Sequence, residues 1–155
     1  MVITSDGRTA VSASRDYSLG VWDTERGKLC RRLQGHRGGV NAVALTPNGQ
    51  TAVSASVDTT LRVWDVSSGQ LLKTLEGHAN SVSDVALTSD GKTAVSVGWD
   101  YTLRVWNIAC GKQVAIYVLE SPGQHVAIAA NDRIVVGTDS GQLHFLTPRN
   151  WPVQN

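Results

Sequence analysis

The sequence has few of the features that mark secreted, metal-binding or membrane proteins. Of its 155 residues only two are cysteines, Cys30 and Cys110, and they fit neither a metal-ligand spacing nor a disulfide framework. The start, "MVITSDGRTA", lacks the basic and apolar segments of a secretory signal, and no run approaches the ~20 apolar residues that span a bilayer. We therefore expect a cytoplasmic protein without a metal, a cofactor or a membrane contact.

An excess of one charge is also absent, because 14 basic and 13 acidic side chains leave a formal net charge of +1. Such a chain has no overall field that would attract nucleic acid. The nearest approach to a basic cluster consists of Lys28, Arg31, Arg32 and Arg37. An apolar content of 41% and a charged content of 17% are typical of a globular protein, and the length suits a single domain over residues 1–155.

What the sequence does contain is a constant spacing of 42 residues that unrelated residue types share. The turns "SDG" (5–7), "PNG" (47–49) and "SDG" (89–91) follow it. A common register among different residue types indicates an internal repeat. The other residues in this register are Trp22, Trp64 and Trp106; Asp16, Asp58 and Asp100; and the Gly-His pairs at 35–36 and 77–78.

Each period carries the pattern of short β-strands rather than of helices. Its segments are rich in Val, Leu and Thr, which suit a pleated, half-buried surface. Asn48-Gly49 supplies the positive φ of a tight hairpin turn. One period therefore predicts a four-stranded antiparallel sheet. The segments of the second period are "VNAVALT" (40–46), "TAVSAS" (51–56), "TLRVWD" (60–65) and "QLLKTLE" (70–76).

These features resemble the WD-repeat (WD40) family of β-propellers, whose signature combines Gly-His, a turn aspartate and Trp-Asp. The dipeptide is Trp-Asp at 22–23 and 64–65 and Trp-Asn at 106–107. The resemblance implies an all-β propeller of about four blades, each a four-stranded antiparallel sheet. The expected divisions are a partial blade one (1–34), blade two (35–76), blade three (77–118), a degenerate blade four (119–147) with Phe145 or Leu146 in place of the tryptophan, and a tail (148–155) whose Trp151 caps the last blade.

The resemblance also implies a hydrogen-bond chain inside each blade, from the turn aspartate through histidine and serine to the tryptophan indole. Blade three has Gly98 at the expected serine position, so we expect its chain to be broken and the blade to be looser. The histidine of blade one would lie before residue 1. The expected members are Ser14, Asp16 and Trp22 in blade one; Asp58, His36, Ser56 and Trp64 in blade two; and Asp100, His78 and Trp106 in blade three.

An alternative reading of Ser56, His36 and Asp58 is a hydrolase triad. A nucleophilic serine must be exposed beside an oxyanion site, whereas this serine is expected in a strand against a tryptophan. A catalytic set also occurs once per site, while this set recurs with each blade. Buried carboxylates and indoles, in contrast, need hydrogen-bond partners for stability alone. The sequence therefore predicts a protein that is not an enzyme.

Residues that bind partners are expected in the loops of one propeller face, as the family resemblance implies. Trp99 and Arg15 are the favoured candidates, because Trp and Arg often dominate binding energy. The alternatives are that Trp99 covers a neighbouring blade and that Arg15 is a solvated surface charge. The expected positions are Arg15 in blade one; Gly39, Asn41 and Val57 in blade two; Ser81, Ser83 and Trp99 in blade three; and His125, Ala127 and Thr138 in blade four.

The function predicted from this is a non-catalytic scaffold that presents loops to a protein or peptide. Wording such as "ALTPNGQTAVSAS" (44–56) also resembles the WD tails of signalling ATPases or kinases, which implies a sensor or autoinhibitory propeller as an alternative. RNA binding is a third and less favoured alternative.

Four blades leave three explanations for how the propeller is completed. The chain is the C-terminal part of a longer propeller with missing N-terminal blades, or two chains form one eight-bladed ring with C2 symmetry, or the four blades close on themselves. Unpaired sheet edges at both ends are an aggregation liability unless something covers them.

Overall fold

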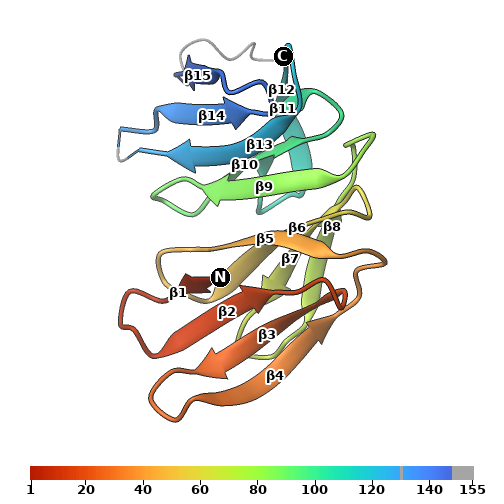
Figure 1. Ribbon diagram of the computed structural model, residues 1–155. Helices are drawn as coiled ribbons and strands as arrows, with labels where there is room; N and C mark the ends of the chain where they lie inside the picture. The colour runs from red at the N-terminus through yellow and green to blue at the C-terminus, as the bar shows by residue number, and fades with distance from the viewer. Residues whose placement is uncertain (130, 148–155) are drawn as a thin grey trace.

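The computed structural model describes residues 1–129 and 131–147, and within them every regular element is a β-strand (Figure 1). The strands form four antiparallel sheets, and in each sheet the strands lie side by side in chain order. The predicted tail, including Trp151, lies outside the described residues. No helix in the described part is long and apolar enough to cross a membrane.

The bounds of the four sheets follow the repeat closely, and each sheet is one blade. The sheet of blade one contains β1 (Val2–Ile3), β2 (Thr9–Ala13), β3 (Ser18–Asp23) and β4 (Lys28–Gln34). Blade two contains β5 (Val40–Leu45), β6 (Thr51–Ser56), β7 (Leu61–Asp65) and β8 (Leu71–Leu75). Blade three contains β9 (Val82–Leu87), β10 (Thr93–Gly98), β11 (Thr102–Asn107) and β12 (Lys112–Val118), and blade four contains β13 (Gly123–Ile128), β14 (Ile134–Thr138) and β15 (Leu143–Leu146).

The hairpin that joins the first two strands of each four-stranded sheet turns at a glycine. Gly7, Gly49 and Gly91 adopt φ values of +72°, +69° and +68°, which a side chain would disfavour. The amide of Gly49 donates to the carbonyl of Thr46 at 2.8 Å, and the amide of Gly91 does the same to Thr88. The turn chemistry that the sequence predicted at Asn48-Gly49 is therefore present in three successive blades.

The hydrophobic core lies between the blades, in three separate clusters. In two of them, the face of one blade that carries Trp64 or Trp106 packs on the aliphatic face of the blade before it, and in the third the apolar face of blade four packs on blade three. Trp64, for example, packs in a cluster with Val11 and Leu19 of blade one. Because strand side chains alternate between the two faces of a sheet, blades two and three are buried on both sides.

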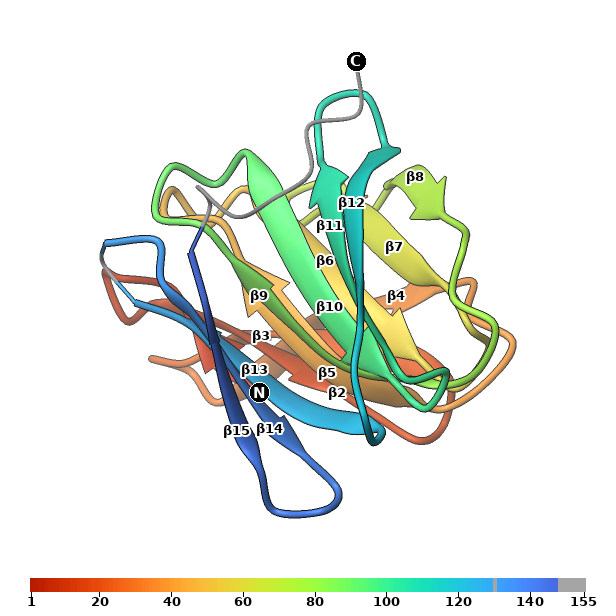
Figure 2. The same cartoon turned by 90° about the horizontal axis from the view of Figure 1, so that it is seen from above.

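The blades are stacked in chain order, with blade one and blade four at opposite ends (Figure 1). Seen from above, blade four lies nearest the viewer (Figure 2). The hydrophobic clusters of the described residues join only consecutive blades. The prediction of an all-β partial propeller of antiparallel sheets is confirmed, with four strands in blades one to three and three strands in the described part of blade four. The explanation that four blades close on themselves is wrong for this structure, because blades one and four lie at opposite ends of the stack.

Candidate functional site

A continuous polar chain crosses blade two from its turn to its core. His36 Nδ1 lies 2.8 Å from Asp58 Oδ2, and His36 Nε2 lies 2.7 Å from Ser54 Oγ. The indole of Trp64 donates to the same Ser54 oxygen at 2.9 Å. The aspartate also accepts the backbone N–H of Arg37, so the carboxylate ties the loop before the inner strand to the turn.

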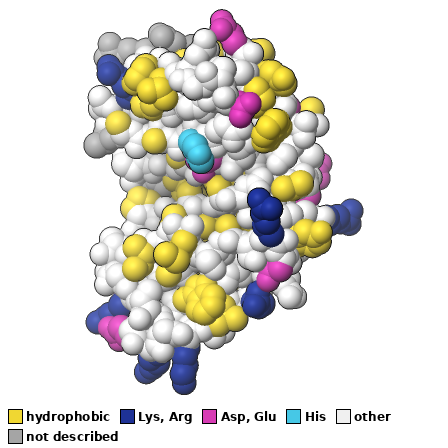
Figure 3. All heavy atoms as spheres, viewed as in Figure 1, with side chains coloured by type: hydrophobic (Ala, Val, Ile, Leu, Met, Phe, Trp, Pro, Cys, Tyr) yellow, Lys and Arg dark blue, Asp and Glu magenta, His cyan; other side chains and the backbone are white. Residues whose placement is uncertain are grey.

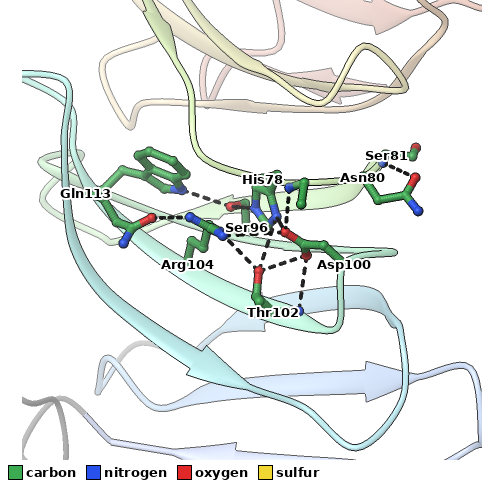
Figure 4. Close-up of polar contacts among 10 residues, drawn as sticks. His78, Asn80, Ser81, Ser96, Asp100, Thr102, Arg104 and Gln113 are labelled. Atoms are coloured by element: carbon green, nitrogen blue, oxygen red, sulfur yellow. Dashed lines mark hydrogen bonds and ion pairs between the residues drawn. The ribbon is translucent and has the colours of Figure 1, made fainter.

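Blade three repeats this chain almost atom for atom (Figure 4). His78 Nδ1 lies 2.9 Å from Asp100 Oδ2, and His78 Nε2 lies 2.8 Å from Ser96 Oγ. Trp106 donates to Ser96 at 2.9 Å. Arg104 lies alongside, where its Nε donates to Thr102 Oγ1 and its Nη2 is 3.6 Å from Asp100.

The serine of the chain is not the one that the sequence predicted. Ser54 and Ser96 hold the position, and Ser56 does not: its hydroxyl donates to the Gly38 carbonyl and accepts the amide of Asp58, each at 3.1 Å. Residues two apart on a strand point to the same face, so the alternation of side chains does not distinguish Ser54 from Ser56.

The same shift of two residues corrects two further expectations. Gly98 occupies the place of Ser56, and the chain of blade three is complete through Ser96, so the predicted break is wrong. In blade one the indole of Trp22 donates to Ser12, not to Ser14. Ser14 instead accepts the amide of Asp16 in the turn.

In the described part of blade one, an arginine rather than an imidazole meets the turn aspartate. Arg32 Nη1 donates to Asp16 Oδ2 at 2.9 Å and to Ser18 Oγ at 3.0 Å. Both side chains of this ion pair are about half exposed, and Trp22 is 36% exposed, against 1% for Trp64 and Trp106. An open pocket of about 330 Å³ lies here, lined by Asp16, Tyr17, Ser18, Arg32, Gln34, Gly35 and His36.

Burial decides the charge state of the two histidines. Desolvation lowers the pKa of His36 and of His78 below the ordinary value of 6.5, although the neighbouring carboxylates act in the opposite direction. Burial alone would raise the pKa of Asp58, but hydrogen bonds from Arg37, Thr60 and His36 outweigh it and lower that pKa to about 2. A neutral imidazole that donates from Nδ1 to the carboxylate and accepts the serine hydroxyl at Nε2 fits both results.

The residue types of a hydrolase triad are therefore assembled in Ser54, His36 and Asp58, but without access for a substrate. Ser54 and Ser96 are 0% exposed, and each hydroxyl is already bonded to an indole and an imidazole. A nucleophile has to reach a reacting atom at about 3 Å, which a fully covered hydroxyl cannot do. The chain can fix the blade and cannot attack a substrate in this structure.

Blade four places apolar side chains where blades two and three have the polar chain. By strand register, Val136 corresponds to Ser54 and Leu146 to Trp64. Leu119 stands four residues before the inner strand, as His78 does before Val82. Leu119 and Val136 are 3% and 0% exposed, and Leu146 packs against their cluster. Of the two residues expected in place of the tryptophan, Leu146 holds the position and Phe145 points to the other face.

The candidate docking residues Arg15, Val57 and Trp99 share one turn position, directly before the turn aspartate, and all three are exposed. The amide of Val57 donates to the Gly39 carbonyl, and that of Trp99 to the Ser81 carbonyl, both at 2.9 Å. In blade four the corresponding bond joins Asp139 to Pro122. We call the row Arg15, Val57, Trp99 and Asp139 the turn row.

This bond corrects the alignment of blade four. The residues in register are Pro122, Gln124 and Asp139, rather than His125, Ala127 and Thr138. Thr138 is only 6% exposed and corresponds to Ser56. His125 is exposed, 3.6 Å from Asp84 of the neighbouring blade. Without a Gly-His pair, the sequence offered no anchor for this alignment.

Two other expected docking residues, Asn41 and Gly39, lie at contacts between blades, and a third, Ser83, has a buried hydroxyl. Asn41 donates to the Val82 carbonyl at 2.8 Å and to Ser81 Oγ at 3.2 Å, which joins blade two to blade three. Gly39 is buried next to the backbone of Arg15. The Ser83 hydroxyl is buried and makes no hydrogen bond to a described residue.

Two exposed tyrosines that the sequence reasoning passed over flank the turn row. Tyr17 and Tyr101 are about half exposed and adopt positive φ values of +72° and +62°. Thr59 has a φ of +72° at the same position of blade two, so this conformation, which bulky residues rarely adopt, belongs to the turn of the repeat. The signal in the sequence was a tyrosine directly after the turn aspartate, in "RDYS" and "WDYT".

The stacked sheets, the recurring chain and the exposed turns define a protein built of β-propeller blades. The family model described as "WD domain, G-beta repeat" matches residues 27–65 and 69–107, about half of the chain. The chain therefore belongs to the WD-repeat family, whose domains are generally non-catalytic and mediate protein interactions. No curated protein matches the chain.

Proposed function

We propose that this chain is a protein-interaction scaffold whose partner, a protein or peptide, docks along the turn row. The observation that carries the proposal is the recurrence of one exposed side chain at the same turn position in successive blades. In blades two, three and four its backbone amide is also fixed by a hydrogen bond to the loop beside it. A rigid backbone lowers the entropic cost of binding. Specificity then depends on which side chain each blade presents.

The chemistry of the turn row suggests what the partner looks like. Arg15 is at the blade-one end and Asp139 at the blade-four end, with Val57 (50% exposed) and Trp99 (45% exposed) between them. Such a row suits an apolar segment with an acidic group toward blade one and a basic group toward blade four. Trp99 is the expected centre of binding energy, because it is large, rigid and exposed.

Nucleic acid is a poorer fit for the same surface. Arg15 is the one basic side chain of the turn row, and Asp139 would repel a phosphate backbone. In the view of Figure 3, the Lys and Arg side chains are spread apart rather than gathered in one patch.

The exposed free thiols of Cys30 and Cys110 support our placement of the scaffold in the cytoplasm.

The test is a pull-down from cytosolic extract with the wild-type chain and two variants. We expect Trp99→Ala to lose the partner with a melting temperature close to wild type. The matched control is Tyr117→Ala, because Tyr117 is also 45% exposed but lies on the outer strand β12. Equal capture by the wild type and Trp99→Ala, or a large loss of stability in Trp99→Ala, would contradict the proposal.

A further inference from the structure

Arg62 of blade two and Arg104 of blade three hold the same strand position but differ in their hydrogen-bond partners. Arg104 donates from Nε to Thr102 Oγ1 and from Nη1 to Gln113 Oε1 (Figure 4). Its Nη2 also lies 3.6 Å from Asp100. The Nε–H of Arg62, in contrast, is buried and has no hydrogen-bond partner among the described residues. Leaving a buried donor unpaired costs stability, so blade two lacks an acceptor that blade three has.

One position on the outer strand accounts for this difference. In blade three, Gln113 lies opposite Trp106 in the strand register. In blade two, Leu71 lies opposite Trp64. Because an aliphatic side chain cannot accept a hydrogen bond, the change from glutamine to leucine leaves Arg62 without this partner.

The glycine of each Gly-His pair makes room for the arginine of its blade. A Cβ at Gly35 would collide with Nη1 of Arg62. A Cβ at Gly77 would lie 2.8 Å from Nη1 of Arg104. The guanidinium is therefore held against the same loop in both blades, and a group that is fixed in advance binds a ligand at a lower entropic cost.

Arg62 also lines a pocket of about 270 Å³ on blade two. The Asp58 carboxylate in this pocket is already bound to His36 and to the amide of Arg37. Neither Arg37 nor Arg62 forms an ion pair within the described part of the chain. Two cationic side chains thus remain to receive a ligand. The complete lining is Arg37, Asp58, Thr60, Arg62, Thr74 and Glu76.

The chemistry of the pocket selects a group with one negative charge. A planar guanidinium matches a carboxylate, which accepts two parallel N–H bonds from it. A phosphate with two charges fits less well, because Asp58 and Glu76 also line the pocket.

We propose that this pocket binds a single carboxylate group, which supplies to Arg62 the acceptor that Gln113 supplies to Arg104. In a protein partner the group is an Asp or Glu side chain or the C-terminal carboxylate. That use rests on the proposed scaffold function, whereas the site itself can be tested without a partner.

The test is a titration of the full chain with acetate at constant ionic strength, followed by nitrogen-15 NMR. We expect the Nε–H signal of Arg62, assigned with Arg62→Gln, to shift and saturate. Arg62→Gln, followed by the Thr74 amide, should raise the dissociation constant for acetate at least ~10-fold, because it removes charged hydrogen bonds. Arg104→Gln is the matched control and should bind acetate as the wild type does.

A second variant fills the pocket from within. Leu71→Gln gives blade two the acceptor that blade three has, and Leu71 is 42% exposed, so the strand should tolerate the change. The new amide should compete with acetate and weaken its binding. Leu72→Gln, at a side chain of the same strand that is 49% exposed, is the matched control and should leave the affinity unchanged.

Two blocked compounds distinguish the sources of the carboxylate. The α-amide of N-acetylaspartic acid carries only a side-chain carboxylate, and N-acetylglycine carries only a terminal one. Binding of either compound supports the site, and the tighter of the two identifies the source.

The proposal would be overturned by an Arg62 signal that does not saturate with acetate, or by equal affinity in the wild type and Arg62→Gln. Tighter binding of phosphate or of neutral acetamide than of acetate would also overturn it. These titrations contain no partner, so their failure is distinct from a failure of the Trp99→Ala pull-down.

Discussion

Blades two and three differ from blade one in the partner of the turn aspartate, although the three sequences are closely alike around it. All three have a serine that accepts a hydrogen bond from the tryptophan, and all three have the turn aspartate. In blades two and three a buried histidine joins these groups, while in blade one an exposed arginine holds the aspartate. The turn aspartate and the serine–indole pair thus belong to a closed, buried chain in blades two and three and to partly solvated groups in blade one, whose tryptophan no described blade covers.

Blade four extends the comparison, because it is buried without any polar chain. Leu119, Val136 and Leu146 fill the corresponding positions. Replacing a buried polar set by well-packed apolar residues is often neutral or favourable for stability. We infer that the acid–imidazole–serine–indole chain fixes the geometry of the turn and the loop before the inner strand, while apolar packing provides most of the stability.

The largest expected difference between the blades concerns the tryptophans. Trp64→Ala should lower the free energy of unfolding by about 3–5 kcal/mol, as expected for a fully buried aromatic residue. Trp22→Ala should have less than half of that effect, because this side chain is already 36% exposed. Urea unfolding followed by circular dichroism measures both. Equal losses would show that blade one is as tightly covered as blade two.

Removing the histidine is the next largest change. His36→Ala should destabilise the fold by about 2–3 kcal/mol, because Asp58 loses a charge-assisted partner and Ser54 loses an acceptor in a buried site. Arg32→Ala, which removes the partner of Asp16 in blade one, should change the unfolding midpoint very little, since exposed ion pairs contribute little. A larger loss of unfolding free energy in Arg32→Ala than in His36→Ala would contradict this difference between the blades.

Replacing the serine that accepts the indole N–H should give a smaller difference between blades two and one, with the same Ser→Ala substitution in both. Ser54→Ala should lower the free energy of unfolding by about 2 kcal/mol, because it leaves both the Trp64 indole and the His36 imidazole without a buried partner. Ser12→Ala should cost less, because water can reach the Trp22 indole. Thermal unfolding of the two variants checks this, and Ser56→Ala is the control that preserves the chain.

The smallest expected effect is a dependence of stability on pH. The folded-state pKa values of His36 and His78 lie below 6.5, so the native state binds fewer protons than the unfolded state below that pH. Their contribution is complete above about pH 6.5 and is lost as the pH falls below it. Asp58, with a pKa of about 2 against 3.8, adds a further loss between those values. The melting temperature, measured from pH 7.5 to pH 3, should fall first below about pH 6.5, as the histidines are protonated, and again below about pH 3.8, as Asp58 is protonated. A melting temperature that rises on acidification from pH 7 to pH 5 would refute this dependence.

The sequence predicted the fold and the repeat because a fixed spacing constrains many residues at once. It also identified the aspartate, histidine and tryptophan, because each recurs at the 42-residue spacing. The serine was missed because Ser54 and Ser56 point to the same face of one strand, and only the contacts distinguish them. Blade four was misaligned because Leu119, Val136 and Leu146 carry no signature, so the backbone bond from Asp139 to Pro122 was needed to set its register.

His36 and His78 act in this structure as internal, neutral members of a structural chain. Nitrogen-15 NMR of the imidazoles, assigned with His36→Gln and His78→Gln, tests this most directly. We expect both rings to carry their proton on Nδ1, donated to Asp58 and Asp100, to exchange it slowly with solvent, and to become charged only at a lower pH than an ordinary histidine. Rings that become charged at the pH of an ordinary histidine or above it, or a proton on Nε2 with fast exchange, would contradict this structural role.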